Sequence, residues 1–267
     1  MLHVPGSVFP PGLYPETTPA RLVRAENLRP LVHGSPIATM YISRTGGGIR
    51  RLIGTAHRHV VAMRRDPQMK FGQPTEGIVE GPAAQRCATD PDIPFYQTQP
   101  FRLVLPYAGK LGSYIADILY VTSDGTVWVR EIKRRLADLM DPDYQAKLEA
   151  VCWLIARLGW KFRPWIHEEV LGNVERQVNV ATIYFDRAAS LDGLMPRFEE
   201  IAASTPIIPF GELILALDSR NMNRARAAVH RLIMQGRVWA DLDLPLEAWT
   251  DVRLRAAPAP AMNLPLI

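Results

Sequence analysis

The chain has 267 residues, of which 48% are hydrophobic and 22% are charged, a composition that excludes wholesale disorder and allows a buried core. Lys and Arg outnumber Asp and Glu by 31 to 27, a mild basic excess that permits a nucleic-acid partner without requiring one. Two cysteines are too few for a disulfide scaffold or a cysteine-rich zinc site. The sequence has no apolar run of membrane-spanning length and no signal-peptide pattern at its start. We therefore expect a soluble, cytoplasmic protein with no membrane partner.

The first part of the chain divides into an arm and two strands. Prolines are concentrated in residues 1–37, and because proline fixes φ and lacks a backbone donor, we expect an extended N-terminal arm there. Apolar and β-branched residues predict strands over 38–43 and 58–64. Three consecutive glycines at 46–48 separate them and indicate a turn.

Strand patterns dominate from Phe101 onward. The predicted strands cover 101–107, 113–121, 125–133, 161–167 and 179–185. Apolar residues at helical spacing predict a helix from Asp143, which can cap it, to Leu158. A run of strands followed by a helix and a further strand predicts an α/β domain, over residues 38–187, with a mixed central sheet flanked by helices.

The last quarter of the chain has a different pattern. It reads as a helix over 210–217, a polar break, a second helix over 224–235 and a short strand after Gly236. That order predicts a helical, winged-helix-like domain, which we place at 188–267.

Three charged residues in the predicted strands form the main candidate site. Asp117 lies in one strand, and Glu131 and Lys133 lie in the next, beyond the turn at 123–125. Residues i and i+2 of a strand share a face, so Glu131 and Lys133 should project together while Ile132 faces the other way. Neighbouring carboxylates repel unless a cation lies between them, and an oxygen-only site suits Mg²⁺ or Mn²⁺. Lys133 could then orient an attacking water or stabilise developing negative charge.

The alternative is that these are ordinary charges on a half-exposed strand. The pattern Asp…Glu-x-Lys is common by chance. However, Asp117 stands among Ile115, Ile118 and Leu119, and a charge within such an apolar run is costly unless it has a partner. This context favours a functional site.

Taken together, the ordered motifs resemble the PD-(D/E)xK nuclease superfamily, and in particular the TnsA-type endonuclease subunits of heteromeric transposases. The resemblance covers residues 40–185 and rests on Asp117, on Glu131-x-Lys133 and on the later helix with Lys147-Leu148-Glu149. It also matches Glu80, ahead of Gln99-Pro100, to the family's helical acid, with Glu76 as the alternative. It implies a restriction-endonuclease-like fold in which Glu80 joins Asp117 and Glu131 as metal ligands.

The resemblance also implies an activity and partners. TnsA-type proteins are Mg²⁺-dependent DNA endonucleases that nick the 5′ ends of a transposon. A separate DDE-type transposase cuts and joins the 3′ ends, and an AAA+ ATPase regulator contacts the complex. Such a protein would act on the nucleoid in bacterial cytoplasm. A non-catalytic DNA-binding adaptor and a stand-alone restriction-type nuclease are the alternatives.

A basic run precedes the candidate site, and further arginines flank it. Arginines of this kind contact phosphates without reading sequence. The expected DNA-binding residues are Arg50, Arg51, Arg58, Arg64, Arg65, Arg134 and Arg135. Arg130 adds to the same positive potential. The alternative for the run is a solvated face. For the C-terminal domain, both DNA and a protein partner stay open.

Overall fold

The computed structural model describes residues 17–22, 38–43, 48–49, 61–64 and 72–255. Within these ranges, helices and strands alternate in a mixed α/β arrangement, which confirms the fold class expected from the sequence. None of the helices in this part of the chain has both the length and the apolarity needed to cross a membrane.

The sheet that carries the candidate site has four strands. They are β5 (Phe95–Thr98), β8 (Ile118–Val121), β9 (Val127–Lys133) and β10 (Lys161–Ile166). Their order is β10-β9-β8-β5, with β10 parallel to β9 and the other neighbours antiparallel. The sheet is therefore mixed, as predicted.

Two further sheets involve the N-terminal half. A second four-stranded sheet has the order β1-β2-β6-β7 and is antiparallel throughout. Its strands are β1 (Thr17–Leu22), β2 (Thr39–Ser43), β6 (Phe101–Tyr107) and β7 (Lys110–Ile115). β3 (Val61–Arg64) pairs with β4 (Gln73–Glu76). Residues 17–22 of the proline-rich segment thus form an edge strand rather than an isolated arm.

The two four-stranded sheets are joined at one place. β5 runs into β6 through Gln99 and Pro100, and β7 runs into β8 through Ala116 and Asp117, so each chain segment changes sheet at the same level. The backbone N–H of Gln99 donates to the carbonyl of Asp117 over 2.8 Å, and that of Ala116 donates to Phe101 over 3.4 Å. Asp117 therefore lies between β7 and β8, and its backbone carbonyl is fixed by the N–H of Gln99.

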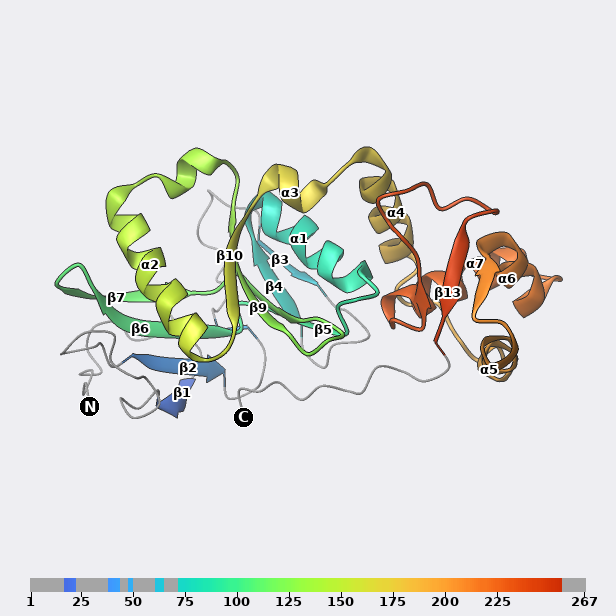
Figure 1. Cartoon of the computed structure of the whole chain (residues 1–267), viewed down its shortest axis with the longest axis horizontal. Coiled ribbons are helices and arrows are strands. Elements are labelled where there is room, and N and C mark those ends of the chain that lie inside the picture. Colours follow the sequence, from blue (N-terminus) through green and yellow to red (C-terminus); the bar gives the residue numbers. More distant parts are fainter. Residues whose placement is uncertain (1–16, 23–37, 44–47, 50–60, 65–71, 256–267) are drawn as a thin grey trace.

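Helices cover both faces of the site-bearing sheet (Figure 1). On one face, Tyr120 and Ile132 belong to the same apolar cluster as Ala84 of α1 (Gly77–Thr89). On the other face, Val129 packs in a cluster with Val151 of α2 (Pro142–Arg157). Alternate residues of β9 thus pack against different helices, as the period of a strand requires. A short 3₁₀ helix, η1 (Leu136–Leu139), links β9 to α2, and α3 (His167–Leu171) follows β10.

The segment predicted as a strand over 179–185 is instead the second half of α4 (Val174–Phe185), so that prediction is wrong. Its β-branched and aromatic residues favour a strand locally. The side chain of Asn173 caps the helix by accepting from the backbone N–H of Arg176. Asn179, Ile183 and Tyr184 then share one buried face. Packing of that face overrides the local preference.

The C-terminal part combines three helices with a small sheet. In chain order its elements are α5 (Met195–Ser204), β11 (Ile207–Pro209), α6 (Phe210–Asp218), α7 (Met222–Met234), β12 (Val238–Trp239) and β13 (Asp251–Leu254). The strands form an antiparallel sheet in the order β11-β13-β12. The two predicted helices are therefore confirmed as α6 and α7.

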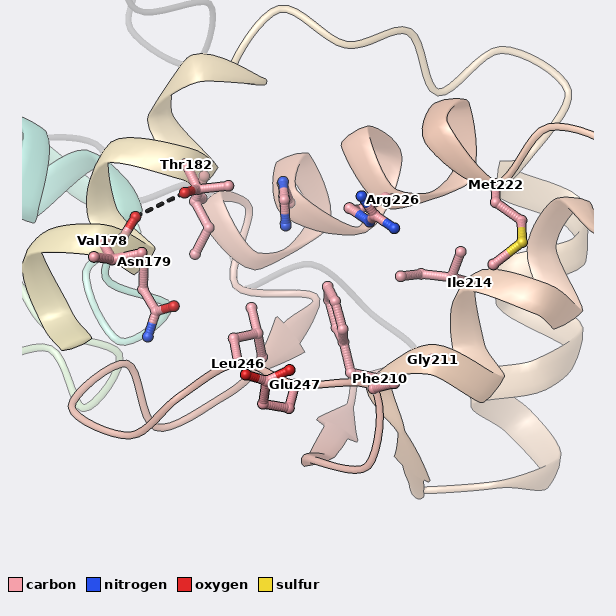
Figure 2. Close-up of a pocket in the computed structure, with 13 residues that line it drawn as sticks. Val178, Asn179, Thr182, Phe210, Gly211, Ile214, Met222, Arg226, Leu246 and Glu247 are labelled. Atoms are coloured by element: carbon pink, nitrogen blue, oxygen red, sulfur yellow. Dashed lines mark hydrogen bonds between the residues drawn. The ribbon is translucent and has the colours of Figure 1, made fainter.

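A cavity of about 380 Å³ lies between α4, α6, α7 and the segment 246–248. Figure 2 shows Phe210 at its centre, with Arg226, Thr182 and Glu247 around it. His230 lines the same cavity and stacks on Phe210, with ring centroids 5.9 Å apart. The cavity belongs to the C-terminal part and α4 and contains none of the acids of the candidate site.

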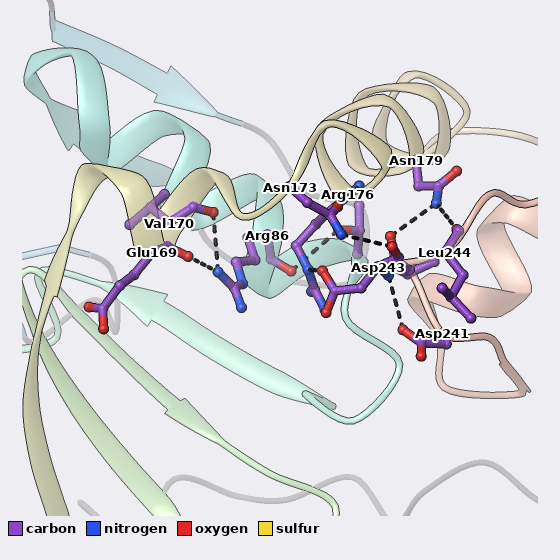
Figure 3. Close-up of polar contacts among 11 residues, drawn as sticks. Arg86, Glu169, Val170, Asn173, Arg176, Asn179, Asp241, Asp243 and Leu244 are labelled. Atoms are coloured by element: carbon purple, nitrogen blue, oxygen red, sulfur yellow. Dashed lines mark hydrogen bonds and ion pairs between the residues drawn. The ribbon is translucent and has the colours of Figure 1, made fainter.

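Polar contacts hold the C-terminal part against α4 (Figure 3). Nε and Nη2 of Arg176 each lie 2.5 Å from a carboxylate oxygen of Asp243. The buried amide of Asn179 donates to the carbonyls of Leu242 and Leu244 over 3.0 and 2.8 Å. One apolar cluster also runs from Ile132 in the sheet to Val252 in β13. The two parts on either side of the expected boundary near residue 188 therefore share a core.

Candidate active site

Asp117, which directly precedes β8, lies level with Glu131 on the neighbouring strand β9. Ile118 pairs with Arg130 in the antiparallel β8–β9 ladder, so the register brings Asp117, one residue earlier, to the level of Glu131. Oδ2 of Asp117 accepts a 2.6 Å hydrogen bond from the backbone N–H of Ile132. The structure thus brings together the two carboxylates that the sequence paired. Ile132 packs on the other face of the sheet, as expected.

The two oxygens of the Glu131 carboxylate have different surroundings. Oε1 accepts from Nζ of Lys133 over 2.5 Å and from the hydroxyl of Tyr144 in α2. Oε2 has no hydrogen-bond partner among the residues that the structure describes, although Glu131 is only 4% exposed. A buried carboxylate oxygen without a donor is costly, so this atom marks a position where a positively charged or donating group would be stabilised.

The electrostatics of the site follow from this crowding. Burial raises the pKa of Asp117 well above its usual range, and the charges of Glu131 and Glu80 raise it further. Burial opposes the charge on Lys133, but the neighbouring Glu131 carboxylate outweighs it, and the pKa of Lys133 is raised. Lys133 is thus an ammonium in direct contact with the Glu131 carboxylate.

The helical acid, Glu80, lies in the first turn of α1. One of its carboxylate oxygens accepts a 2.7 Å hydrogen bond from the backbone N–H of Glu76, the residue that precedes the helix. This bond turns the Glu80 side chain back toward the helix start, where its charge contributes to the raised pKa of Asp117. Glu76 instead ends β4, in register with Val61. Of the two alternatives, the geometry favours Glu80.

The donor set fits a hard divalent cation, but it is not preassembled. Carboxylate oxygens are the ligands that Mg²⁺ and Mn²⁺ prefer, and Glu131 offers a buried oxygen without a donor. Among the described residues, however, no three acidic, histidine or cysteine side chains are gathered closely enough to hold a metal ion. Lys133 and Tyr144 occupy the other oxygen of Glu131. Asp117 and Glu131 therefore fit as two of the ligands that such an ion would need.

The structure describes the side chains of only some of the expected DNA-binding residues. Arg134 and Arg135 follow Lys133 directly and are exposed. Arg50, Arg51, Arg58 and Arg65 lie outside the described residues, and Arg64 is described only as a backbone position of β3. The arginine side chains that can be placed thus lie at the end of β9, next to the acids.

Arg130 does not add to this exposed potential, and that expectation is wrong. Its side chain is on the opposite face of β9 from Glu131 and is buried. The guanidinium lies 4.3 Å from the ring centroid of Trp128 and 4.8 Å from that of Trp165, and Nε donates to the hydroxyl of Tyr120. Cation–π contacts therefore stabilise Arg130 in the core.

Two tyrosines that the sequence did not assign to the site, Tyr144 and the buried Tyr114, also face Glu131. Tyr144 donates to Glu131, and Lys147 of the later motif, one turn later in α2, lies 4.7 Å from the Tyr144 ring centroid. In the sequence Tyr144 reads as an apolar position of the helix. Its polar role depends on how α2 packs over β9, which local spacing does not reveal.

No family model matches this chain, and no curated protein matches it. The interpretation of the site therefore rests on its geometry and on the resemblance of its motifs.

Proposed function

We propose that the protein is a metal-dependent DNA endonuclease of the TnsA type, which nicks the 5′ ends of a transposable element during cut-and-paste transposition. The observation that carries this proposal is the arrangement of three side chains. Asp117, at the start of β8, lies level with Glu131 on the adjacent strand β9, and Lys133 contacts Glu131 on the same face of β9.

The proposed fold is restriction-endonuclease-like. Its support is the mixed sheet with a helix on each face, in which an acid at a strand break faces a Glu-x-Lys strand. The preceding helix places Glu80 near Asp117. These are the positions that the motif resemblance assigns to the PD-(D/E)xK nucleases.

In the proposed chemistry, Asp117 and Glu131 hold Mg²⁺, for which Mn²⁺ can substitute, and Glu80 assists. The bound metal would polarise the scissile phosphate and make a bound water more acidic. Lys133 is an ammonium with no lone pair to offer a metal, so its role is to orient the attacking water or to stabilise negative charge on the phosphate. The Ile132 N–H donates to one oxygen of Asp117 and so fixes the position of its carboxylate.

The proposed substrate is duplex DNA. Arg134 and Arg135 are exposed immediately beyond Lys133, where they can contact the phosphates next to the scissile one. The basic run with Arg50, Arg51, Arg58, Arg64 and Arg65 is proposed to extend this contact. The net charge of +4 is small, which fits a subunit that shares DNA binding with partners.

For the C-terminal part we infer a winged-helix-like domain. The order helix, strand, helix, helix, strand, strand supports this, because the last two strands and the segment between them would form the wing. The proposed partners are a DDE-type transposase, which acts on the 3′ ends, and an AAA+ ATPase regulator that this part would dock. The complex would act on the nucleoid in bacterial cytoplasm.

The adaptor alternative is less well supported by the site. An adaptor has no need of a buried carboxylate pair, and burial and the neighbouring charges, which raise the pKa of Asp117, make such a pair costly to keep ionised. A carboxyl group perturbed by burial and by a neighbouring charge is a candidate for a functional site.

The test is a pair of substitutions in a reconstituted transposase. Asp117→Ala should lose both Mn²⁺ binding and 5′-end nicking, whereas Lys133→Ala should lose nicking while Mn²⁺ binding largely survives. In both, 3′-end joining by the partner should continue, so the product shifts from simple insertion to a joined, replicative intermediate. A Lys133→Ala protein that nicks 5′ ends at the unmodified single-turnover rate would refute the proposal.

A control separates the proposal from a stand-alone restriction-type nuclease. Omitting the transposase and the regulator should abolish cutting of transposon ends by the unmodified chain. Efficient cutting of plain duplex DNA by the isolated chain would instead support the stand-alone enzyme.

A further inference from the structure

Tyr144 is held in place at the start of α2. The side chain of Asp141 caps the helix by accepting a 2.8 Å hydrogen bond from the backbone N–H of Tyr144, and Pro142 opens the first turn. Two ammonium groups lie near its ring, with Nζ of Lys133 5.0 Å and Nζ of Lys147 4.7 Å from the ring centroid. Cation–π attraction on the ring and the cap on the backbone together limit how far the hydroxyl can move.

The hydroxyl of Tyr144 is a hydrogen-bond donor to Glu131. A phenol hydroxyl is protonated at neutral pH, so Tyr144 donates a hydrogen bond to the Glu131 carboxylate. This bond ends on Oε1 of Glu131, the oxygen that Lys133 also contacts. The other oxygen, Oε2, makes no hydrogen bond with the geometry of a direct contact to a described group, while the buried hydroxyl of Tyr114 on β7 also faces the Glu131 carboxylate.

The two donors to Oε1 differ in one important respect. The proposed reaction requires the Lys133 ammonium at the water or the phosphate, and an ammonium that moves there releases Glu131. Tyr144 is neutral, and nothing in the proposed reaction requires it elsewhere. It can therefore keep the carboxylate oriented without cancelling the negative charge that a cation needs.

We propose that Tyr144 is a positioning residue for the metal site, which holds Oε1 of Glu131 so that Oε2 is presented to a divalent cation beside Asp117. The inference rests on the proposed function, because it assigns Glu131 to the metal. It adds a residue of α2 to a site that the motifs place entirely on α1, β9 and the β7–β8 junction.

The experiment measures Mn²⁺ affinity of the full chain by electron paramagnetic resonance of the free ion. Tyr144→Phe keeps the ring and removes the hydroxyl, and we expect Mn²⁺ to bind about three- to tenfold more weakly, the range of one hydrogen bond. Tyr107→Phe, a matched change on β6 outside the site, should leave Mn²⁺ affinity unchanged. The nicking defect of Tyr144→Phe should disappear at saturating Mn²⁺, whereas that of Lys133→Ala should persist.

A double-mutant cycle shows whether Tyr144 acts through Glu131. In a Glu131→Gln background, adding Tyr144→Phe should cause no further loss of Mn²⁺ affinity. An equal loss in both backgrounds would overturn the proposal, because Tyr144 would then act through another group. The proposal would also be overturned if Tyr144→Phe bound Mn²⁺ with unchanged affinity while Asp117→Ala bound none. That result would still support a metal site at Asp117. Unchanged Mn²⁺ binding in Asp117→Ala would instead refute the proposed function.

Discussion

The carboxylate of Asp117 accepts a hydrogen bond from the backbone N–H of Ile132, on the neighbouring strand and one residue beyond the opposing acid Glu131. This bond joins the strand break between β7 and β8 to the strand that carries Glu-x-Lys. It favours the ionised form of Asp117, yet burial and the two neighbouring carboxylates outweigh it, and the pKa of Asp117 is raised. The ionised site is therefore held together at a cost in stability.

Asp117→Asn is expected to make the metal-free protein more stable. The amide oxygen can still accept from Ile132, while the repulsion with Glu131 is removed, so the free energy of unfolding should rise by about 1 kcal/mol. Because the folded protein raises the pKa of Asp117, its proton is bound more tightly in the folded state. The protonated form of Asp117 therefore stabilises the fold at low pH, and the unmodified protein loses that contribution as pH rises. The increase in the free energy of unfolding caused by Asp117→Asn should thus be larger at pH 8 than at pH 5. Urea unfolding at the two pH values measures it.

Asp124→Asn is the matched control on the exposed turn between β8 and β9. A hydrogen bond from Thr122, the larger cause, and hydrogen bonds from Thr126 lower the pKa of Asp124 to about 2. The ionised form of Asp124 is therefore favoured in the folded protein. Its replacement should therefore give no gain in stability at pH 8. A gain at Asp124 equal to that at Asp117, or none at Asp117, would contradict the idea of a strained carboxylate pair.

The acid pair could be predicted from the sequence because a tight turn and a period of two fix which residues of a hairpin meet. The pairing of Asp117 with Glu131 needs only the turn at 123–125 and the alternation of β9. The same alternation also places Arg130 in the core, and the expectation that Arg130 adds to the exposed positive potential was wrong because it ignored this parity. Its aromatic partner Trp165 comes from β10, which local spacing could not supply.

Local sequence patterns could not predict the contacts between segments that lie far apart in the chain. The helix α4 was predicted as a strand because its β-branched residues favour one, and only packing of Ile183 and Tyr184 into the larger core settles the matter. Tyr144 reaches Glu131 only because α2 packs over β9. The shared core across residue 188 is likewise a tertiary effect, since Asn179 meets Leu242 more than sixty residues later.

Arg134 and Arg135 are expected to contact DNA phosphates. Replacing both with Ala should weaken binding of duplexes of any sequence about equally and should reduce the slope of log affinity against log salt by about 2. Fluorescence anisotropy at salt concentrations from about 50 to about 200 mM measures this slope, because affinity that depends on phosphate contacts falls steeply over that range. Arg197→Ala is the control, because Arg197 is paired with Glu200 on α5. A salt slope unchanged by the double substitution would assign both arginines to a solvated surface.

The contact between α4 and the C-terminal part is expected to depend on Asn179. Its buried amide donates to the carbonyls of Leu242 and Leu244, and Asn179→Ala leaves both carbonyls without that donor. Loss of such a buried donor should lower the free energy of unfolding by about 2 kcal/mol. Gln177→Ala, on the exposed face of the same helix, should change it little. Equal effects of the two substitutions in urea unfolding would show that this contact does not stabilise the protein.

His230 is expected to make the protein less stable in acid. It is buried in α7, stacked on Phe210, and Nδ1 lies 2.6 Å from a carboxylate oxygen of Asp186. Burial lowers the pKa of His230, and Arg226 adds to this, although Asp186 opposes both. A histidine whose pKa is lowered on folding binds its proton more tightly when unfolded, so stability is lost as pH falls below the unfolded pKa of about 6.5.

Urea unfolding at pH 7.5 and pH 5 measures this dependence for the unmodified protein and two variants. His230→Gln removes the titrating group and should flatten the dependence. Asp186→Asn removes the charge that favours protonated His230, so its pKa should fall further and the loss of stability in acid should become steeper. Opposite changes in the two variants are the signature of His230. If both variants keep the unmodified slope, another group is responsible for the sensitivity to acid.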